Sequence, residues 1–201
     1  MSDGRGDRQT SIAEALLLAP GSGSSADHPS LLAIEAAVAP LPVRRFDFPY
    51  RLAGKRFPDK APVLLESVAV EAATLVASAR CEPSRLALGG RSMGGRMCSM
   101  AVAAGLPAAA LVLICYPLHP PGKPDKLRVD HFPSITQPCL FVSGTRDPFG
   151  TVDELEAATT TIAGPVRHVW IDGAGHGLDR KGDHVLVVEA VRQFLAAEGY
   201  D

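Results

Sequence analysis

Short hydrophobic runs recur along the chain, separated by longer stretches in which hydrophobic and polar residues mix as they do in helices. The runs are rich in Leu, Val and Ile and are continuously hydrophobic, whereas a strand with one wet face alternates hydrophobic and polar residues. They therefore predict strands that are covered on both faces. These strands are expected at residues 14–20, 42–48, 84–90, 109–117, 137–144 and 166–172.

Candidate helices occupy the intervals around the predicted strands. They are expected at residues 28–39, 62–80, 93–105, 151–162 and 183–198. Pro62 suits the first turn of the second helix, and the acidic residues Asp153, Glu154 and Glu156 lie where the dipole of the fourth helix favours negative charge. Strands and helices in alternation are typical of a parallel sheet with helices on both faces, so the predicted fold class is α/β.

The length of the chain is that of one domain. Its 201 residues are 46% hydrophobic, which is enough for a substantial core. We expect this domain to span residues 12–201 and the polar segment 1–11 to be disordered. Two connections, at residues 49–61 and 118–138, are longer than usual, and such loops often wall the ligand crevice of an α/β domain.

Charge and hydropathy argue against polyanionic partners and against the membrane. Twenty basic and 22 acidic residues give a formal charge of −2, which offers no field to attract nucleic acid or an anionic lipid surface. The polar N-terminus does not read as a secretory signal, and Gly105 and Pro107 interrupt the longest apolar stretch, at residues 100–118. We therefore expect a cytoplasmic protein that binds neither nucleic acid nor membranes.

The four cysteines, Cys81, Cys98, Cys115 and Cys139, are widely spaced and form no Cys-x-x-Cys pair. This spacing indicates neither a zinc site nor a disulfide framework. We interpret them as buried thiols in a reducing compartment, and Cys98 as a core residue of its helix.

One segment carries a nucleophile motif. Gly90-Arg91-Ser92-Met93-Gly94 matches G-x-S-x-G, in which a sharp strand-to-helix turn exposes a serine oxygen at the edge of a sheet. The predicted strand before it and the predicted helix after it supply the context that this motif requires. Ser92 is therefore the candidate nucleophile, with a serine in a purely structural turn as the alternative.

A serine hydroxyl needs a base to accept its proton and an acid to orient that base, in the chain order Ser, Asp, His. Asp147 in GTRDPFG and His176 in GAGHGLD each follow a predicted parallel strand, so both are expected at the same sheet edge as Ser92. Asp147 alternatively caps the helix after Pro148. Less favoured by position are Asp172, Asp179, His28, His119, His131, His168 and His184.

An oxyanion hole needs two backbone N–H groups, one from the residue after the nucleophile and one from a loop after an early strand. Met93 supplies the first. The second is expected from the glycine-containing loop at residues 19–29, with Ser22 as the preferred donor and Gly21 next.

These motifs together resemble the small bacterial α/β-hydrolases of the dienelactone-hydrolase-like kind. In particular, they resemble the subgroup related to the eukaryotic testis-expressed and NSL-complex-subunit hydrolase-like proteins. The segments that carry the resemblance are LLLAPGSGSSADHP, the FPY at residues 48–50, GGRSMGGRMCS, YPLHPPGKPDKLR, GTRDPFG and GAGH. It implies an α/β-hydrolase sheet of about six strands with little or no lid, and it implies nucleophile, acid and base at Ser92, Asp147 and His176.

The sequence departs from these relatives at two positions. Pro20-Gly21 stands where they often have His-Gly, and Gly177 stands where they often have Asp after the catalytic histidine. The first departure changes how the oxyanion loop is held, and the second changes the surroundings of His176.

The function expected from the sequence is a serine hydrolase for a small ester or thioester, working without metal or organic cofactor. Candidate substrate contacts in the long loops are Tyr50, Arg51, Tyr116 and His119. The competing hypothesis is a catalytically silent hydrolase-like scaffold or binding protein. A Rossmann dinucleotide site is disfavoured because residue 91, read from Gly89, is Arg where G-x-G-x-x-G needs Gly.

The same long loops are rich in Lys and Arg. A solvated surface is the favoured interpretation. The alternative is a cationic rim, formed by Arg51, Lys55 and Lys123, that receives an ester carrying a carboxylate or phosphate.

Overall fold

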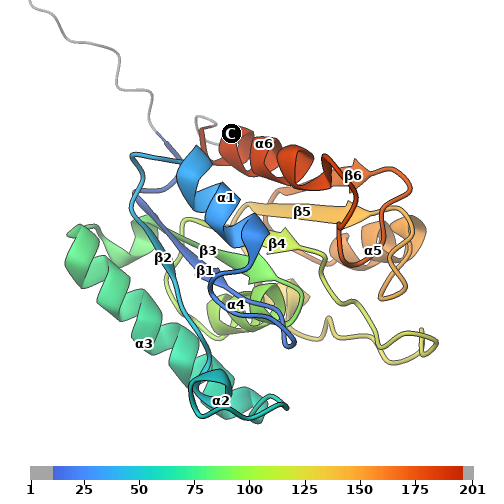
Figure 1. Cartoon of the computed structure of the whole chain (residues 1–201), viewed down its shortest axis with the longest axis horizontal. Helices are drawn as coiled ribbons and strands as arrows, with labels where there is room; N and C mark the ends of the chain where they lie inside the picture. The colour runs from blue at the N-terminus through green and yellow to red at the C-terminus, as the bar shows by residue number, and fades with distance from the viewer. Residues whose placement is uncertain (1–10, 197–201) are drawn as a thin grey trace, which may run out of the picture.

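Six parallel strands form one sheet at the centre of the protein, with helices on both faces (Figure 1). A computed structural model describes residues 11–196 of the chain. The strands are β1 (Ala15–Ala19), β2 (Val43–Arg45), β3 (Leu86–Arg91), β4 (Ala110–Ile114), β5 (Cys139–Gly144) and β6 (Val166–Ile171). All six predicted strands are confirmed. The predicted disordered segment, residues 1–11, lies outside the described residues except for Ser11.

The helices follow the strands as the sequence predicts. They are α1 (Pro29–Ala37), α2 (Pro49–Leu52), α3 (Ala61–Ala79), α4 (Met93–Ala103), α5 (Val152–Thr159) and α6 (Asp183–Ala196), with 3₁₀ turns at Pro83–Arg85 and Phe132–Ser134. Five match the five predicted helices. The single-turn helix α2 was not predicted, because four residues are too few to show a helical hydrophobic period.

Two predicted strands are longer than the observed ones, for identifiable reasons. The run at residues 42–48 pairs only as far as Arg45, because Phe46 and Phe48 leave the sheet and pack in the core. The run at residues 109–117 stops at Ile114, because Cys115 takes a positive φ of 50° and turns the chain.

The strand order is β2-β1-β3-β4-β5-β6, and every neighbouring pair is parallel. From β1 the chain goes outward to β2 and then returns to the other side of β1 for β3. The loops after β1 and β3 therefore leave the sheet in opposite directions at one edge, which is the position where open α/β sheets hold ligands.

Alternate residues of each strand feed two separate cores. Leu16 and Leu18 of β1 pack under α1 and α6, whereas Leu17 faces the opposite layer, which contains α3, α4 and α5 (Figure 1). The inner strands are buried along their whole length, and the edge strands β2 and β6 are only partly buried. Coverage on both faces explains why the inner strands read as continuous hydrophobic runs.

Within the described residues, α3 is the one helix long and apolar enough, by length and composition, to cross a membrane, with a mean hydropathy of 1.5. In this structure it packs Leu64, Val68, Ala72 and Leu75 into the core beside β1 and α4. Its other side is largely exposed.

The cysteines are free thiols, and three of the four are buried. Cys98 is fully buried on α4, as predicted, with its Sγ 3.2 Å from the carbonyl oxygen of Gly89. Burial raises the pKa of its thiol to about 12, so it stays protonated and acts as a small apolar side chain.

The turn between β3 and α4 lies directly against β1. A Cβ added at Gly90 would fall 2.1 Å from the carbonyl oxygen of Ala19, and one added at Gly94 would fall 2.4 Å from the same atom. Gly90 also has a φ of 154°, which side chains rarely adopt. Glycine is therefore required on each side of the serine because backbone occupies the space of a side chain.

We expect Gly94→Ala to lower the free energy of unfolding by about 1–3 kcal/mol, because α4 must move away from the end of β1. Gly23→Ala is the matched control, since a Cβ there meets nothing within 4 Å. Denaturant unfolding measures both. Equal stability of the two variants would contradict the close approach.

Candidate active site

Ser92 occupies the turn between the end of β3 and the start of α4, with φ 50° and ψ −118°. A non-glycine residue in this conformation is strained and is held there by its surroundings. Its own N–H donates to the carbonyl of Ile114 on β4 at 2.8 Å. Ser92 therefore lies in the turn itself, outside the regular structure of β3 and α4.

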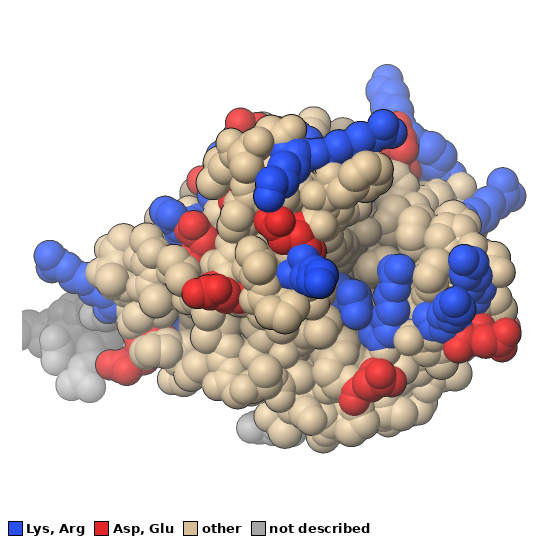
Figure 2. Space-filling view, turned by 90° about the horizontal axis from the view of Figure 1, so that it is seen from below, with Lys and Arg blue, Asp and Glu red and all other residues tan. Residues whose placement is uncertain are grey.

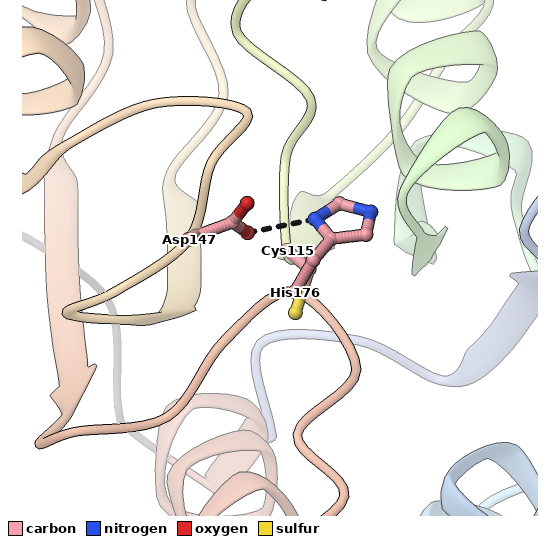
Figure 3. A group of neighbouring side chains, drawn as sticks. All are labelled: Cys115, Asp147 and His176. Atoms are coloured by element: carbon pink, nitrogen blue, oxygen red, sulfur yellow. Dashed lines mark hydrogen bonds and ion pairs between the residues drawn. The ribbon is translucent and has the colours of Figure 1, made fainter. Parts of the chain in front are cut away.

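The structure brings Ser92, His176 and Asp147 into one hydrogen-bonded chain. His176 Nε2 lies 2.9 Å from Ser92 Oγ, and His176 Nδ1 lies 2.7 Å from Asp147 Oδ2. Figure 3 shows the carboxylate and the imidazole facing each other across the second of these bonds. The order from nucleophile to base to acid is the one that serine activation needs.

A second hydrogen bond, separate from the one to His176, holds the Asp147 carboxylate in place. The residue is 5% exposed, and its Oδ1 accepts the N–H of Phe149 at 2.9 Å, which leaves Oδ2 for His176. The alternative role as a helix cap does not hold, because Thr151 and Glu154 form the capping box of α5. The rival Asp172 is exposed and accepts instead from the Thr145 hydroxyl at 3.3 Å.

The loop after β1 brings the predicted oxyanion donors to the serine. Gly21 is buried against it, and a Cβ added there would lie 3.7 Å from the Cβ of Ser92. The carbonyl of Ser22 accepts the hydroxyl of Tyr50 at 2.8 Å, so a fully buried ring anchors this loop. Within residues 11–196, the N–H groups of Met93 and Ser22 donate to no protein acceptor.

Gly177, the second departure from the relatives, has a local explanation. A Cβ at this position would fall 1.6 Å from Asp179 Oδ2. The carboxylate of Asp179 thus occupies the space in which a side chain at residue 177 would begin. A carboxylate therefore lies beside residue 177 although residue 177 itself has none.

Arg91, next to the serine, ties the nucleophile turn to the histidine loop. It is 8% exposed, and its Nη2 donates to the carbonyls of His176 and Gly177 at 2.9 and 2.5 Å. These bonds fix the backbone of the loop that carries His176.

A cavity of about 550 Å³ opens over Ser92. Its wall contains Gly21, Ser22 and Met93 together with residues that were not predicted from the sequence as site residues. These are Gly23, Ser24, His28, Arg91, Arg96, Pro117, Arg128 and Phe149. A second hollow of similar volume lies between α1 and α6, but it lacks a nucleophile paired with a base.

Phe149 and the cavity arginines were missed for different reasons. Phe149 belongs to the quoted motif GTRDPFG, and its ring lies over His176 with centroids 4.1 Å apart. Its position two residues after Asp147 could therefore have suggested that it lies near the site. Arg96 comes one helical turn after Ser92, and that spacing could also have suggested it. Arg128 could not be predicted in this way, because its position depends on the path of a long loop.

The four residues expected to contact substrate do not line this cavity. Tyr50 and Tyr116 are buried, and the hydroxyl of Tyr116 donates to the carbonyl of Arg128 at 2.7 Å. His119 is buried between the Pro120 carbonyl and Glu154. Arg51 is exposed on α2. In this structure the two tyrosines support the loops that form the cavity wall. Sequence position alone does not show whether such a residue supports a loop or contacts a ligand.

Cys115 adds a third possible ligand atom to the Asp147–His176 pair, and the three lie within 4.8 Å of one another (Figure 3). As a metal site the group fits poorly. Burial raises the pKa of the Cys115 thiol to about 12, and the nearest atoms of the other two are already hydrogen-bonded to each other. A metal needs a thiolate and free ligand atoms.

His131 lies against α4, close enough to Arg96 to be affected by its charge. Its Nε2 is 2.8 Å from the hydroxyl of Ser99 on α4. Burial and then the charge of Arg96 lower the pKa of His131 to about 4, against a smaller opposing effect of Asp130. The imidazole is therefore neutral at physiological pH.

Comparison with known proteins identifies the family. The model of the alpha/beta hydrolase domain family matches residues 12–195. The chain belongs to this family. The resemblance inferred from the motifs is thereby confirmed at the level of the α/β hydrolases, and both family and fold support a hydrolase with a small-molecule substrate.

Curated relatives match only parts of the chain. Epoxide hydrolase A of Mycobacterium tuberculosis (strain ATCC 25618 / H37Rv) is 44% identical over 64 residues, 31% of this chain and 19% of that protein. An uncharacterized protein of the same strain is 32% identical over 133 residues, 57% of this chain and 46% of that protein. The chain spans less than half the length of both.

Solved structures share the α/β hydrolase fold at low identity. An alpha-beta serine hydrolase homologue from Coxiella burnetii has a TM-score of 0.71 and 17% identity, with 90% of this chain and 85% of that one covered. A dienelactone hydrolase from Anabaena variabilis has a TM-score of 0.70 and 20% identity at the same coverage. Est1E from Butyrivibrio proteoclasticus has a TM-score of 0.70 and 16% identity, with 94% of this chain and 89% of that one covered.

The depressed pKa of His131 predicts an acid-sensitive fold. Between pH 6.5 and about 4 the unfolded chain binds a proton at His131 that the folded protein does not, so stability falls as pH falls through this window. We expect His131→Gln to flatten that dependence in denaturant unfolding at several pH values. His184→Gln, at an exposed histidine of α6, is the control, and an equal effect of both substitutions would refute the prediction.

Proposed function

We propose that this α/β hydrolase is a serine hydrolase that cleaves a small ester or thioester through an acyl-enzyme. One observation carries the proposal, the unbroken chain from Ser92 Oγ to His176 to the buried carboxylate of Asp147. Each link is within hydrogen-bond distance, and the hydroxyl opens into a cavity.

In the proposed reaction Ser92 Oγ attacks the carbonyl carbon while His176 Nε2 takes the hydroxyl proton. The carboxylate of Asp147 accepts a hydrogen bond from the Nδ1–H of His176, which keeps Nε2 unprotonated and able to act as base, and its negative charge stabilises the imidazolium that forms. His176 then gives its proton to the departing alcohol or thiol. In the second half His176 takes a proton from a water molecule, whose oxygen attacks the acyl carbon. The bond between that carbon and Ser92 Oγ then breaks, His176 returns the proton to Oγ, and the acid is released.

Negative charge on the carbonyl oxygen is proposed to be held by the N–H groups of Met93 and Ser22. Met93 begins α4, so its N–H also lies at the positive end of a helix dipole. Ser22 lies in the loop anchored by Tyr50, which supports a donor already in place before substrate arrives. The bond between Tyr50 and Ser22 holds the same loop in which the resembling proteins often have a histidine at the position of Pro20.

The cavity supports a substrate of modest size. Its volume of about 550 Å³ is in the range of small-molecule sites, and Phe149 gives it an apolar surface beside the base. The chain between β4 and β5 contains only the 3₁₀ turn Phe132–Ser134 as regular structure, so within the described residues no helical lid is inserted there.

Covalent labelling tests the nucleophile. We expect a fluorophosphonate probe to label the wild-type protein once, and the protein to hydrolyse 4-nitrophenyl acetate or butyrate. Ser92→Ala should lose both properties, whereas Ser84→Ala, at an exposed serine of the 3₁₀ turn Pro83–Arg85 outside the cavity wall, should keep both. A folded wild-type protein that neither reacts nor hydrolyses would favour the silent scaffold, and labelling of Ser92→Ala would place the nucleophile elsewhere.

Replacement of the acid tests the proposed proton path. Asp147→Asn keeps the shape but favours the wrong imidazole tautomer, so kcat should fall by about 10⁴-fold, as in other serine triads. Asp172→Asn, at an exposed carboxylate closer to His176 in sequence, should leave kcat within about twofold of wild type. Steady-state kinetics on a 4-nitrophenyl ester compare them, and a larger loss in Asp172→Asn would reverse the assignment.

A further inference from the structure

The cavity over Ser92 is positively charged. Three of its lining residues, Arg91, Arg96 and Arg128, carry guanidinium groups, and its wall contains no Asp or Glu. Arg91 is bonded to two backbone carbonyls. Arg96 and Arg128 make no ion pair with any residue in the described part of the chain.

A partly buried arginine elsewhere in the protein, Arg45, is neutralised by carboxylates. Arg45, whose side chain is 18% exposed, pairs with both Glu35 and Asp27 at 2.5 and 2.9 Å. In contrast, the Nε of Arg96 is buried and has no hydrogen-bond acceptor. A buried donor on a charged group without an acceptor costs free energy, and such groups are uncommon unless something else satisfies them.

The groups around Arg96 do not neutralise it. Tyr116 and His131 are its close titratable neighbours, and both are uncharged, because burial raises the pKa of the phenol and lowers that of the imidazole. The Arg96 side chain also hydrogen-bonds the Tyr116 phenol, but this neutral partner leaves the charge of Arg96 unpaired. The exposed Asp130 acts on His131 but forms no ion pair within residues 11–196. Burial and then the charge of Arg96 lower the pKa of Arg128, so the two cations act on each other.

The position of this pair relates it to Ser92. Arg96 is four residues beyond the serine on α4, so it lies on the same side of the helix about one turn, ~5.4 Å, further along. Arg128 comes from the long loop after β4 and lines the same cavity. Figure 2 shows Lys and Arg side chains gathered beside a hollow on one face of the molecule.

We propose that Arg96 and Arg128 form an anion subsite, and that the substrate is a small ester bearing a carboxylate or phosphate group a few bonds from the carbonyl that Ser92 attacks. The inference rests on the proposed function, since it names the substrate class of that site. Guanidinium groups offer paired donors that match both kinds of oxyanion. The anion supplies the acceptors and the negative charge that the cavity wall lacks.

This subsite replaces the cationic rim considered from the sequence. Of the three residues of that rim, Lys55 lies 3.6 Å from Asp59, and Arg51 and Lys123 are exposed. All three are absent from the cavity wall. The charge that faces Ser92 comes from the nucleophile helix and from the last part of the long loop.

Two esters that differ by one charge test the proposal. Mono-4-nitrophenyl adipate carries a free carboxylate, and its methyl ester is the neutral twin. Wild-type protein should have a higher kcat/KM for the anionic ester, chiefly through a lower KM, and added NaCl should reduce that preference. The 4-nitrophenyl monoester of 6-phosphonohexanoic acid, with its dimethyl phosphonate as neutral twin, distinguishes a phosphate-type from a carboxylate subsite.

Substitutions show which residues cause the preference for the anionic ester. Arg96→Gln and Arg128→Gln should each lower kcat/KM for the preferred anionic ester about 10- to 100-fold and change the neutral twin by less than about threefold. Arg96→Lys keeps a charge but not the paired donors, so it should retain part of the preference. Lys126→Gln removes an exposed charge from the same loop and should leave both rates unchanged.

Equal ratios of anionic to neutral turnover in wild type, Arg96→Gln and Arg128→Gln would overturn the subsite while leaving the hydrolase intact. Absence of turnover on every ester, with no labelling of Ser92, would refute the proposed function instead. In that case calorimetry with adipate and inorganic phosphate still decides the subsite. Binding of either anion that Arg96→Gln abolishes supports it, and no binding to the wild-type protein refutes it.

Discussion

The site depends on the close approach of the nucleophile turn to the end of β1. Gly90 and Gly94 put backbone where side chains would collide with the Ala19 carbonyl, and this contact fixes both the strained Ser92 and the loop that begins at Pro20. Because β1 and β3 are neighbours at the switch in strand order, Ser92 and the proposed oxyanion loop meet without any long excursion of the chain. The geometry around the serine is thus a property of the sheet.

Much of this arrangement could be predicted from the sequence, because it follows from local patterns. Burial on both faces makes the inner strands continuous hydrophobic runs, and strand ends at one sheet edge bring Ser92, Asp147 and His176 together. Side-chain direction was less predictable. Tyr50 and Tyr116 follow strands or loops at the same edge, yet both turn into the core and hold carbonyls. Such orientations depend on packing between distant segments.

Contacts outside the recognised motifs also hold the candidate site. The Tyr50 hydroxyl holds the loop that begins with Pro20, and Asp179 fills the space beside Gly177. Arg91 joins the nucleophile turn to the histidine loop. None of these links is visible in a motif, because each joins residues far apart in the chain or depends on a turn. Arg96 and Arg128, by contrast, line the cavity with no carboxylate partner in the described residues.

The central claim is that Ser92 becomes acylated during turnover. The most direct measurement is mass spectrometry of protein quenched in acid within milliseconds of mixing with an activated 4-nitrophenyl ester, followed by peptide mapping. The account predicts one added acyl group, on the peptide that contains Ser92, which disappears as hydrolysis proceeds. An acyl group on another residue, such as Cys115, or turnover with no acylated protein, would contradict it.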